Sequence, residues 1–204
     1  MKLPRSFYDR PTLDVARDLV GTVLVHRRRN IVTSGIIVEV EAYIGESDPA
    51  CHAAPGPTRR NAPLYGRPGH AYVYLNYGIH CLVNIVTEAE GAPAAVLIRA
   101  LEPLEGIATM RRRRSRAMKG RRTQRGASLA VADLCRGPGN LTMAMGITLE
   151  ENMLDLTGDR LFVESRGVTA DRVVWSPRVG IRVGTERPWR AFLAGHPAVS
   201  GPRG

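Results

Sequence analysis

Short runs of apolar and β-branched residues constrain the fold of this chain more than any other feature. They fall at residues 22–26, 36–43, 71–75, 81–87 and 95–100. Runs of this length and composition, separated by Gly, Pro and Asn, are typical of β-strands. Three further runs after residue 160 predict short strands at 161–164, 173–175 and 179–183.

Helices are expected between these groups of strands. Leu13, Ala16 and Leu19 form an apolar stripe that begins after Pro11 and stops at Gly21. Pro103 suits the first turn of a second helix that runs to Met110, because proline needs no hydrogen-bond partner at that position. A third helix is expected at 141–145. Strands in groups with helices between them predict an α+β fold with a mainly antiparallel sheet. The 204 residues suit a single domain spanning 1–204.

The positive charge is concentrated in one segment. The formal net charge is +10, and nine of the 29 basic residues lie between Arg111 and Arg125, where there is no acidic residue. The rest of the chain holds 20 basic and 19 acidic residues and is almost neutral. Blocks of like charge repel one another and stay solvated, so we expect a basic, flexible loop at about 111–126. The excess charge favours a polyanionic partner, with nucleic acid ahead of a membrane.

Several classes of protein are disfavoured. The three cysteines have no CxxC spacing, which argues against a disulfide framework or a zinc site. No apolar run approaches the roughly 20 residues that span a bilayer, and the first residues have no apolar signal core. We therefore expect a cytoplasmic, bacterial-type protein associated with the nucleoid, with no membrane contact, no metal and no cofactor.

The run at 36–43 places acidic residues beside a phenol. If it is a regular strand, Ile36, Val38, Val40 and Ala42 face the core, and the opposite face carries Ile37, Glu39, Glu41 and Tyr43. Taken alone, such a row favours a solvated strand face. Two carboxylates beside a phenol are also a candidate site for acid–base chemistry.

Four of the six tyrosines fall between Tyr65 and Tyr77. Tyr72 and Tyr74 share one side of a predicted strand, and Tyr77 precedes Gly78 at a predicted hairpin tip. Tyrosines often form the border of a core. In a basic protein, an aromatic residue at a hairpin tip is equally suited to act as a wedge between stacked bases.

Taken together, these stretches resemble the alkyladenine (3-methyladenine, N-methylpurine) DNA glycosylase family. The resemblance runs in the family's order from Phe7 to Ser200. It is carried by residues 38–43, 48–52, 68–74, 77–78, 84, 97–103, 134–141 and 178–181. It implies a single α+β domain around a curved, mainly antiparallel sheet with flanking helices and a β-hairpin that inserts into the DNA minor groove.

The resemblance also implies catalytic roles. Glu41 matches the general base that activates the water attacking the sugar C1′, and Arg99 matches a residue beside that water and the scissile nucleotide. Tyr77 matches the residue that enters the duplex in place of the flipped nucleotide. Glu39 has no such role, and its Gln variant is expected to retain most activity.

Four further residues match the base pocket. Tyr43 and Tyr74 correspond to its aromatic walls, with His52 beside them, and Asn84 corresponds to the side chain that crowds the 2-amino group of normal guanine. An asparagine within an apolar strand could equally satisfy buried backbone groups.

The implied activity is that of a monofunctional DNA-3-methyladenine glycosylase in base excision repair. Such an enzyme hydrolyses the N-glycosidic bond of a flipped alkylated purine and leaves an abasic site. Deaminated purines are a second candidate class of substrate. The expected partner is double-stranded DNA containing damaged purines, bound by a monomer. Two alternatives remain open: a non-catalytic nucleic-acid-binding module, and a metal-dependent hydrolase that uses Glu39, Glu41 and His52.

Overall fold

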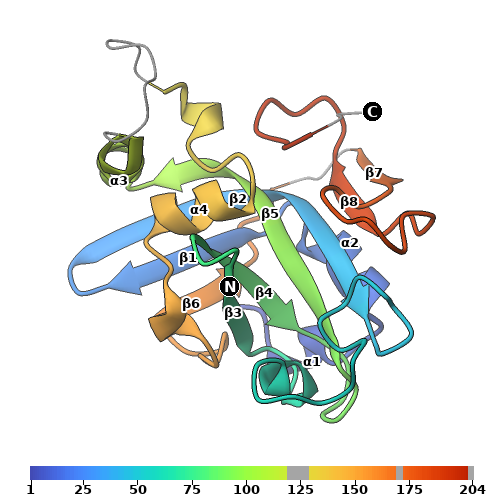
Figure 1. Ribbon diagram of the computed structural model, residues 1–204. Helices are drawn as coiled ribbons and strands as arrows, with labels where there is room; N and C mark the ends of the chain where they lie inside the picture. Colours follow the sequence, from blue (N-terminus) through green and yellow to red (C-terminus); the bar gives the residue numbers. More distant parts are fainter. Residues whose placement is uncertain (119–128, 169–171, 202–204) are drawn as a thin grey trace.

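A curved antiparallel sheet forms the centre of the molecule (Figure 1). The computed structural model describes residues 1–118, 129–168 and 172–201. The strand order is β3-β4-β5-β2-β1-β6, and every pairing among the described residues is antiparallel. The strands are β1 (Val23–Arg28), β2 (Ile31–Ile44), β3 (Ala71–Asn76), β4 (His80–Val86), β5 (Ala94–Glu105), β6 (Leu161–Glu164), β7 (Val173–Ser176) and β8 (Arg190–Leu193).

Strand β2 organises the sheet. It pairs with β5 along one edge, and its other edge is shared by β1 at residues 31–36 and by β8 at residues 39–41. Strand β7 extends the sheet beyond β8. Strand β8 is therefore attached directly to the central strand, although nearly 150 residues separate the two in sequence.

Helices cover the sheet and join its parts. They are α1 (Arg5–Tyr8), α2 (Thr12–Leu19), α3 (Ile107–Met118) and α4 (Pro138–Met145), with 3₁₀ turns at Ala62–Tyr65, Val131–Asp133 and Leu149–Glu151. Helix α2 packs on β2 and β5, α4 packs on β4 and β5, and α3 packs on α4. The predicted α+β fold around a curved antiparallel sheet is confirmed. Among the described residues, no helix has the length and apolar character needed to cross a membrane.

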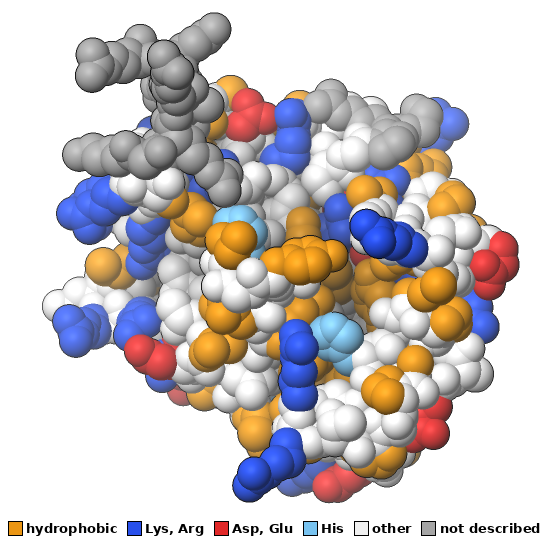
Figure 2. All heavy atoms as spheres, viewed as in Figure 1, with side chains coloured by type: hydrophobic (Ala, Val, Ile, Leu, Met, Phe, Trp, Pro, Cys, Tyr) orange, Lys and Arg blue, Asp and Glu red, His pale blue; other side chains and the backbone are white. Residues whose placement is uncertain are grey.

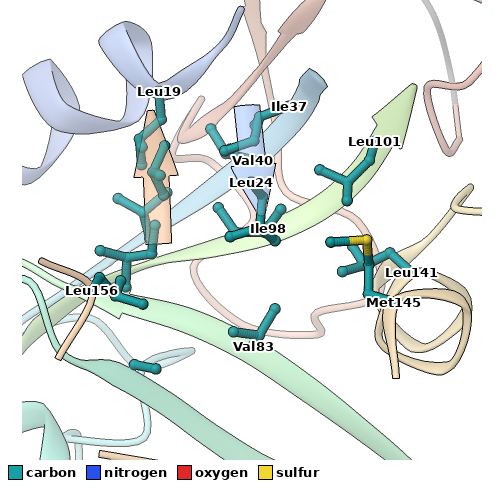
Figure 3. Packing of buried hydrophobic residues seen from close by; sticks show 14 of the residues in the cluster. Leu19, Leu24, Ile37, Val40, Val83, Ile98, Leu101, Leu141, Met145 and Leu156 are labelled. Atoms are coloured by element: carbon teal, nitrogen blue, oxygen red, sulfur yellow. The ribbon is translucent and has the colours of Figure 1, made fainter. Parts of the chain in front are cut away.

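The main core lies between the sheet and its covering helices. Figure 3 shows side chains from β1, β2, β4, β5, α2 and α4 directed toward one another. The residues labelled there are Leu19, Leu24, Ile37, Val40, Val83, Ile98, Leu101, Leu141, Met145 and Leu156. All are at least nine-tenths buried, and each such side chain contributes about 1.5–3 kcal/mol of burial free energy.

Two compensating bulges break the predicted alternation of residues 36–43. The β2–β5 register shifts between Ile37 and Glu39 and again between Glu39 and Val40. Val38 of β2 and Arg99 of β5 are therefore left without a paired residue on the opposite strand. Val38 therefore packs in a second apolar cluster with Phe162, whereas Ile37 joins Val40 in the main core. The expectation of one regular alternation was wrong, because an inserted residue exchanges the faces of a strand.

The expected helix through Met110 is present, but its expected start at Pro103 was wrong. Pro103 belongs to β5 and faces Gly35, where the β2–β5 register is again irregular. Proline is tolerated in strands at such irregularities. Helix α3 starts only at Ile107, after Gly106 has turned the chain with a φ of +75°.

The basic loop expected at 111–126 is helical in its first part. Residues 111–118 form the C-terminal part of α3, so the expectation is corrected there. The remaining positions, 119–126, lie outside the described residues. The helix is compatible with the charge because three of its arginines are bonded to the protein: Arg111 to Leu129 O, Arg113 to Ala144 O and Arg114 to Asn140 Oδ1.

Candidate active site

A cavity of about 400 Å³ opens where β2, β3, β4 and β5 meet two loops. Figure 2 shows hydrophobic side chains gathered around a hollow near the centre of this face, with basic side chains, coloured blue, around it. The lining includes Tyr43, Cys51, His52, Tyr72, Tyr74, Tyr77, Asn84, Leu97, Arg99, Pro138, Val179, Gly180 and Ile181. Six of the seven predicted site residues thus line one cavity, and the seventh, Glu41, lies directly beneath it.

Aromatic rings form one wall. The His52 and Tyr74 ring centroids are 4.4 Å apart, and those of Tyr72 and Tyr74 are 5.3 Å apart. The Tyr72 hydroxyl lies 2.9 Å from His52 Nδ1. Burial and the nearby Arg60 charge lower the pKa of His52, and burial raises the pKa of Tyr72 to about 12. At neutral pH the His52 ring is therefore uncharged, and the Tyr72 hydroxyl can donate to it.

Glu41 is fully buried and held by three groups. Its Oε1 accepts a 2.6 Å hydrogen bond from the Val179 backbone N–H, and its Oε2 accepts a 2.8 Å bond from the Tyr43 hydroxyl. Arg99 Nη1 lies 3.2 Å from the same Oε2. Burial and then the Glu41 charge hold the pKa of Tyr43 far above its ordinary value, so this phenol remains a donor.

Glu39 is equally buried and joins two arginines. Its Oε1 accepts from Arg99 Nε at 2.9 Å and from Arg190 Nε at 2.7 Å, and its Oε2 accepts from the Ser200 N–H at 2.6 Å. Burial acts to lower the pKa of Arg99, but Glu41 and Glu39 outweigh it and raise the pKa. Two carboxylates and two guanidinium groups thus balance one another in a buried network, and Glu39 is not a dispensable neighbour.

The same contacts argue against the metal-dependent alternative. Glu39 is occupied by Arg99 and Arg190, whose positive charges would repel a cation. The His52 ring does not join these carboxylates in a shared site for a cation. Its Nδ1 pairs with the Tyr72 hydroxyl instead. Within the described ranges, no group of three His, Cys, Asp or Glu side chains is arranged to hold a metal ion.

The loop at 178–181 closes the site, although the sequence predicted a strand there. Arg178 makes two bonds to buried Asp48, at 2.5 and 2.8 Å, and a third to Ala42 O at 3.0 Å. Its guanidinium lies 4.7 Å from the centroid of the Tyr43 ring. These contacts fix both Tyr43 and the Val179 N–H that binds Glu41. The sequence motifs contained Asp48 and Arg178, but sequence reasoning assigned them no role, and it missed Arg190 entirely.

Tyr77 and Asn84 lie on the β3–β4 hairpin. Tyr77 is at the tip, 89% exposed, with a φ of +49° followed by Gly78 at +69°. Asn84 is buried at the cavity wall, and its Nδ2 donates to Tyr72 O at 3.0 Å. Asn84 therefore both satisfies a buried carbonyl group and contributes to the surface of the cavity.

Comparison with known proteins gives a consistent result. Residues 6–197 match the family model described as methylpurine-DNA glycosylase (MPG). A relative from Methanocella arvoryzae is 46% identical over 202 residues, which cover 97% of this chain and 95% of the relative. One from Clostridium acetobutylicum is 44% identical over 204 residues, 98% of each chain. Both bear the name "Putative 3-methyladenine DNA glycosylase".

The buried network predicts a large effect of Glu39→Gln. Loss of this charge leaves Arg99 and Arg190 without their shared partner, so we expect the free energy of unfolding to fall by about 3–5 kcal/mol. Urea denaturation measures the change. The matched control is Glu105→Gln at the end of the neighbouring strand β5, where the pair with Arg166 is solvent-exposed and the expected loss is about 0–1 kcal/mol. Equal losses in the two variants would contradict the role given to Glu39.

Proposed function

Because the chain belongs to the methylpurine-DNA glycosylase family, we propose that its cavity receives a damaged purine turned out of the duplex and that Glu41 activates the water that releases it. The protein is a DNA repair glycosylase of the 3-methyladenine type, a monofunctional enzyme that hydrolyses N-glycosyl bonds. The alternative of a non-catalytic nucleic-acid-binding module is therefore set aside.

The observation that carries the role of Glu41 is its position beneath the cavity. A water molecule that attacks C1′ must lose a proton, and the sugar passes through a cation-like transition state. One carboxylate can accept the proton and stabilise the positive charge. Arg99 lies 3.2 Å from Glu41 and favours its ionised form, while Val179 N–H and the Tyr43 hydroxyl fix its orientation.

The aromatic wall suits a base that carries positive charge. Alkylation leaves several purines cationic, and electron-rich rings attract a cation over their faces. In this proposal the base lies between Tyr43 and Tyr74, with His52 beside it. A neutral His52 adds no repulsion to a cationic base, which is why its lowered pKa matters for alkylated substrates.

The β3–β4 hairpin supplies the wedge that this mechanism needs. Extruding a base costs a few kcal/mol of stacking and pairing free energy. An exposed aromatic side chain at a rigid turn can occupy the vacated space and recover part of that cost. Tyr77 is such a side chain, and it also borders the cavity.

Asn84 and the cavity size bear on the range of excised bases. We infer that Asn84 disfavours the 2-amino group of guanine, and that neutral deaminated purines such as hypoxanthine enter the same cavity. The proposed substrate is duplex DNA with damaged purines, bound by a monomer of one domain at the nucleoid.

Glu41→Gln tests the chemical step. The amide retains the size of the side chain but cannot accept the proton of the water, so single-turnover excision of 3-methyladenine should fall at least about a hundredfold. The exposed Glu90→Gln variant removes the same charge elsewhere and should excise at the parental rate. Normal excision by a folded Glu41→Gln protein would falsify the assignment.

Tyr77→Ala separates base extrusion from bond cleavage. The wedge matters most where the lesion is well paired, because there the unstacking cost is largest. Single-turnover excision should therefore fall more for a lesion in a fully paired duplex than for the same lesion in a mismatch. If both substrates lose activity equally, Tyr77 does not act as a wedge.

Asn84→Ser tests the selectivity of the cavity. A smaller side chain should raise excision of guanine-type lesions relative to hypoxanthine by about tenfold, the usual scale of discrimination by crowding. Single-turnover rates on matched duplexes give this ratio. A constant ratio with both rates lowered would indicate that the bond from Asn84 to Tyr72 O is its main role.

A further inference from the structure

The arginines of α3 divide into two groups. Arg111, Arg113 and Arg114 donate to oxygen atoms of the protein and fasten the helix to its neighbours. Arg112 and Arg116 are exposed and lie four residues apart, which places them on one face of the helix. No acidic residue occurs within α3, so nothing on the helix itself balances this face.

A second group of arginines lies at the β1–β2 hairpin. Arg27 and Arg29 are exposed, and Arg29 occupies the turn with a φ of +53°. The Arg27 guanidinium is supported by the Phe162 ring, 5.0 Å away. Arg28 differs from them because it pairs with Glu150 at 2.7 Å.

Helix α3 packs beside β2 at this hairpin, whereas Arg27 lies over Phe162 on the other face of β1 and close to Asp159. Arg113 lies between the exposed arginines of α3. Burial lowers its pKa, and so do the positive charges of Arg112 on the helix and Arg28 on the hairpin. Positive charges of the helix and the hairpin are therefore close enough to repel one another. In Figure 2, blue side chains gather on the side of the face where Figure 1 places α3 and the β1–β2 hairpin.

This region is joined to the cavity by α4. Pro138, at the start of α4, lines the cavity, and Arg113 and Arg114 bind residues of the same helix. A duplex engaged by the β3–β4 hairpin continues beyond the lesion on both sides, and its phosphates carry one charge per roughly 1.7 Å of helix axis. Arg29, Arg112 and Arg116 form no ion pair within the part of the chain that the structure describes, so they are suited to neutralise such phosphates.

We propose that Arg112 and Arg116 of α3, with Arg29 at the turn of the β1–β2 hairpin, form an auxiliary phosphate-binding surface for the duplex flanking the lesion. The proposal rests on the proposed function, because DNA is the partner it requires. The surface contacts the backbone and reads no sequence, so it holds damaged and undamaged DNA alike.

Binding to an undamaged duplex at several salt concentrations tests the surface. Each lost phosphate contact reduces the magnitude of the slope of log K against log salt by about 0.9. Arg112→Gln with Arg116→Gln should therefore reduce it by about 1.8 and weaken binding about tenfold at low salt. Arg29→Gln with Arg112→Gln should act in the same direction by a similar amount. Arg112→Lys with Arg116→Lys retains both charges and should keep the parental slope.

The matched control is Arg17→Gln with Arg172→Gln, which removes two exposed charges elsewhere. If either glutamine pair of the surface changes the slope no more than this control, or if the lysine pair fails to keep it, the proposal is overturned. The measurement requires no bond cleavage. Its failure is therefore distinguishable from failure of the Glu41 assignment, which is read from excision.

Discussion

The negative charge of Glu39 lies at a fully buried point of the central strand, and the geometry of the site depends on how it is neutralised. An unpaired charge in such a position costs several kcal/mol, so its partners must be held closely. Arg99 and Arg190 share one oxygen of Glu39, and a backbone N–H takes the other. Because Arg99 is fixed in this way, its remaining nitrogens reach Glu41 and Ser200.

The paired bulges make this network possible. A regular β2 strand would direct Ile36 and Val38 to the face opposite Glu39 and Glu41. With Val38 as the extra residue, Ile36 packs in the second apolar cluster and Ile37 in the main core. Arg99, which has no cross-strand partner on β2, contacts both carboxylates from β5. The register recovers within two residues, so the apolar core beneath the sheet remains continuous. The local irregularity thus concentrates polar groups without opening the core.

The sequence predicted those features that depend on local pattern. The stripe of α2 and the runs of β3 and β4 were predicted within one or two residues, and a tyrosine followed by glycine correctly indicated an exposed hairpin tip. Bulges leave no such signal, because an inserted residue looks like any other member of an apolar run. Strand β8 was missed because it begins with Arg190, a charged residue whose burial depends on Glu39, 151 positions earlier. The segment 179–183 read as a strand because Val179, Ile181 and Val183 alternate with Gly180 and Arg182. The loop at 178–181 instead binds groups of β2 through its backbone and the Arg178 side chain.

The bond between Ser200 and Glu39 joins residues 161 positions apart, and it has a consequence for synthesis of the enzyme. A nascent chain on the ribosome already contains β2, β5 and the hairpin long before residue 200 is made. Until then Glu39 lacks its backbone donor, and Arg99 lacks the Ser200 hydroxyl. Contacts of such long range also form late in folding, because closing a large loop is entropically costly. The buried network of Glu39, Arg99 and Ser200 can therefore be completed only after translation has passed this point, so a partly synthesised chain would hold the Tyr77 hairpin before it holds this network.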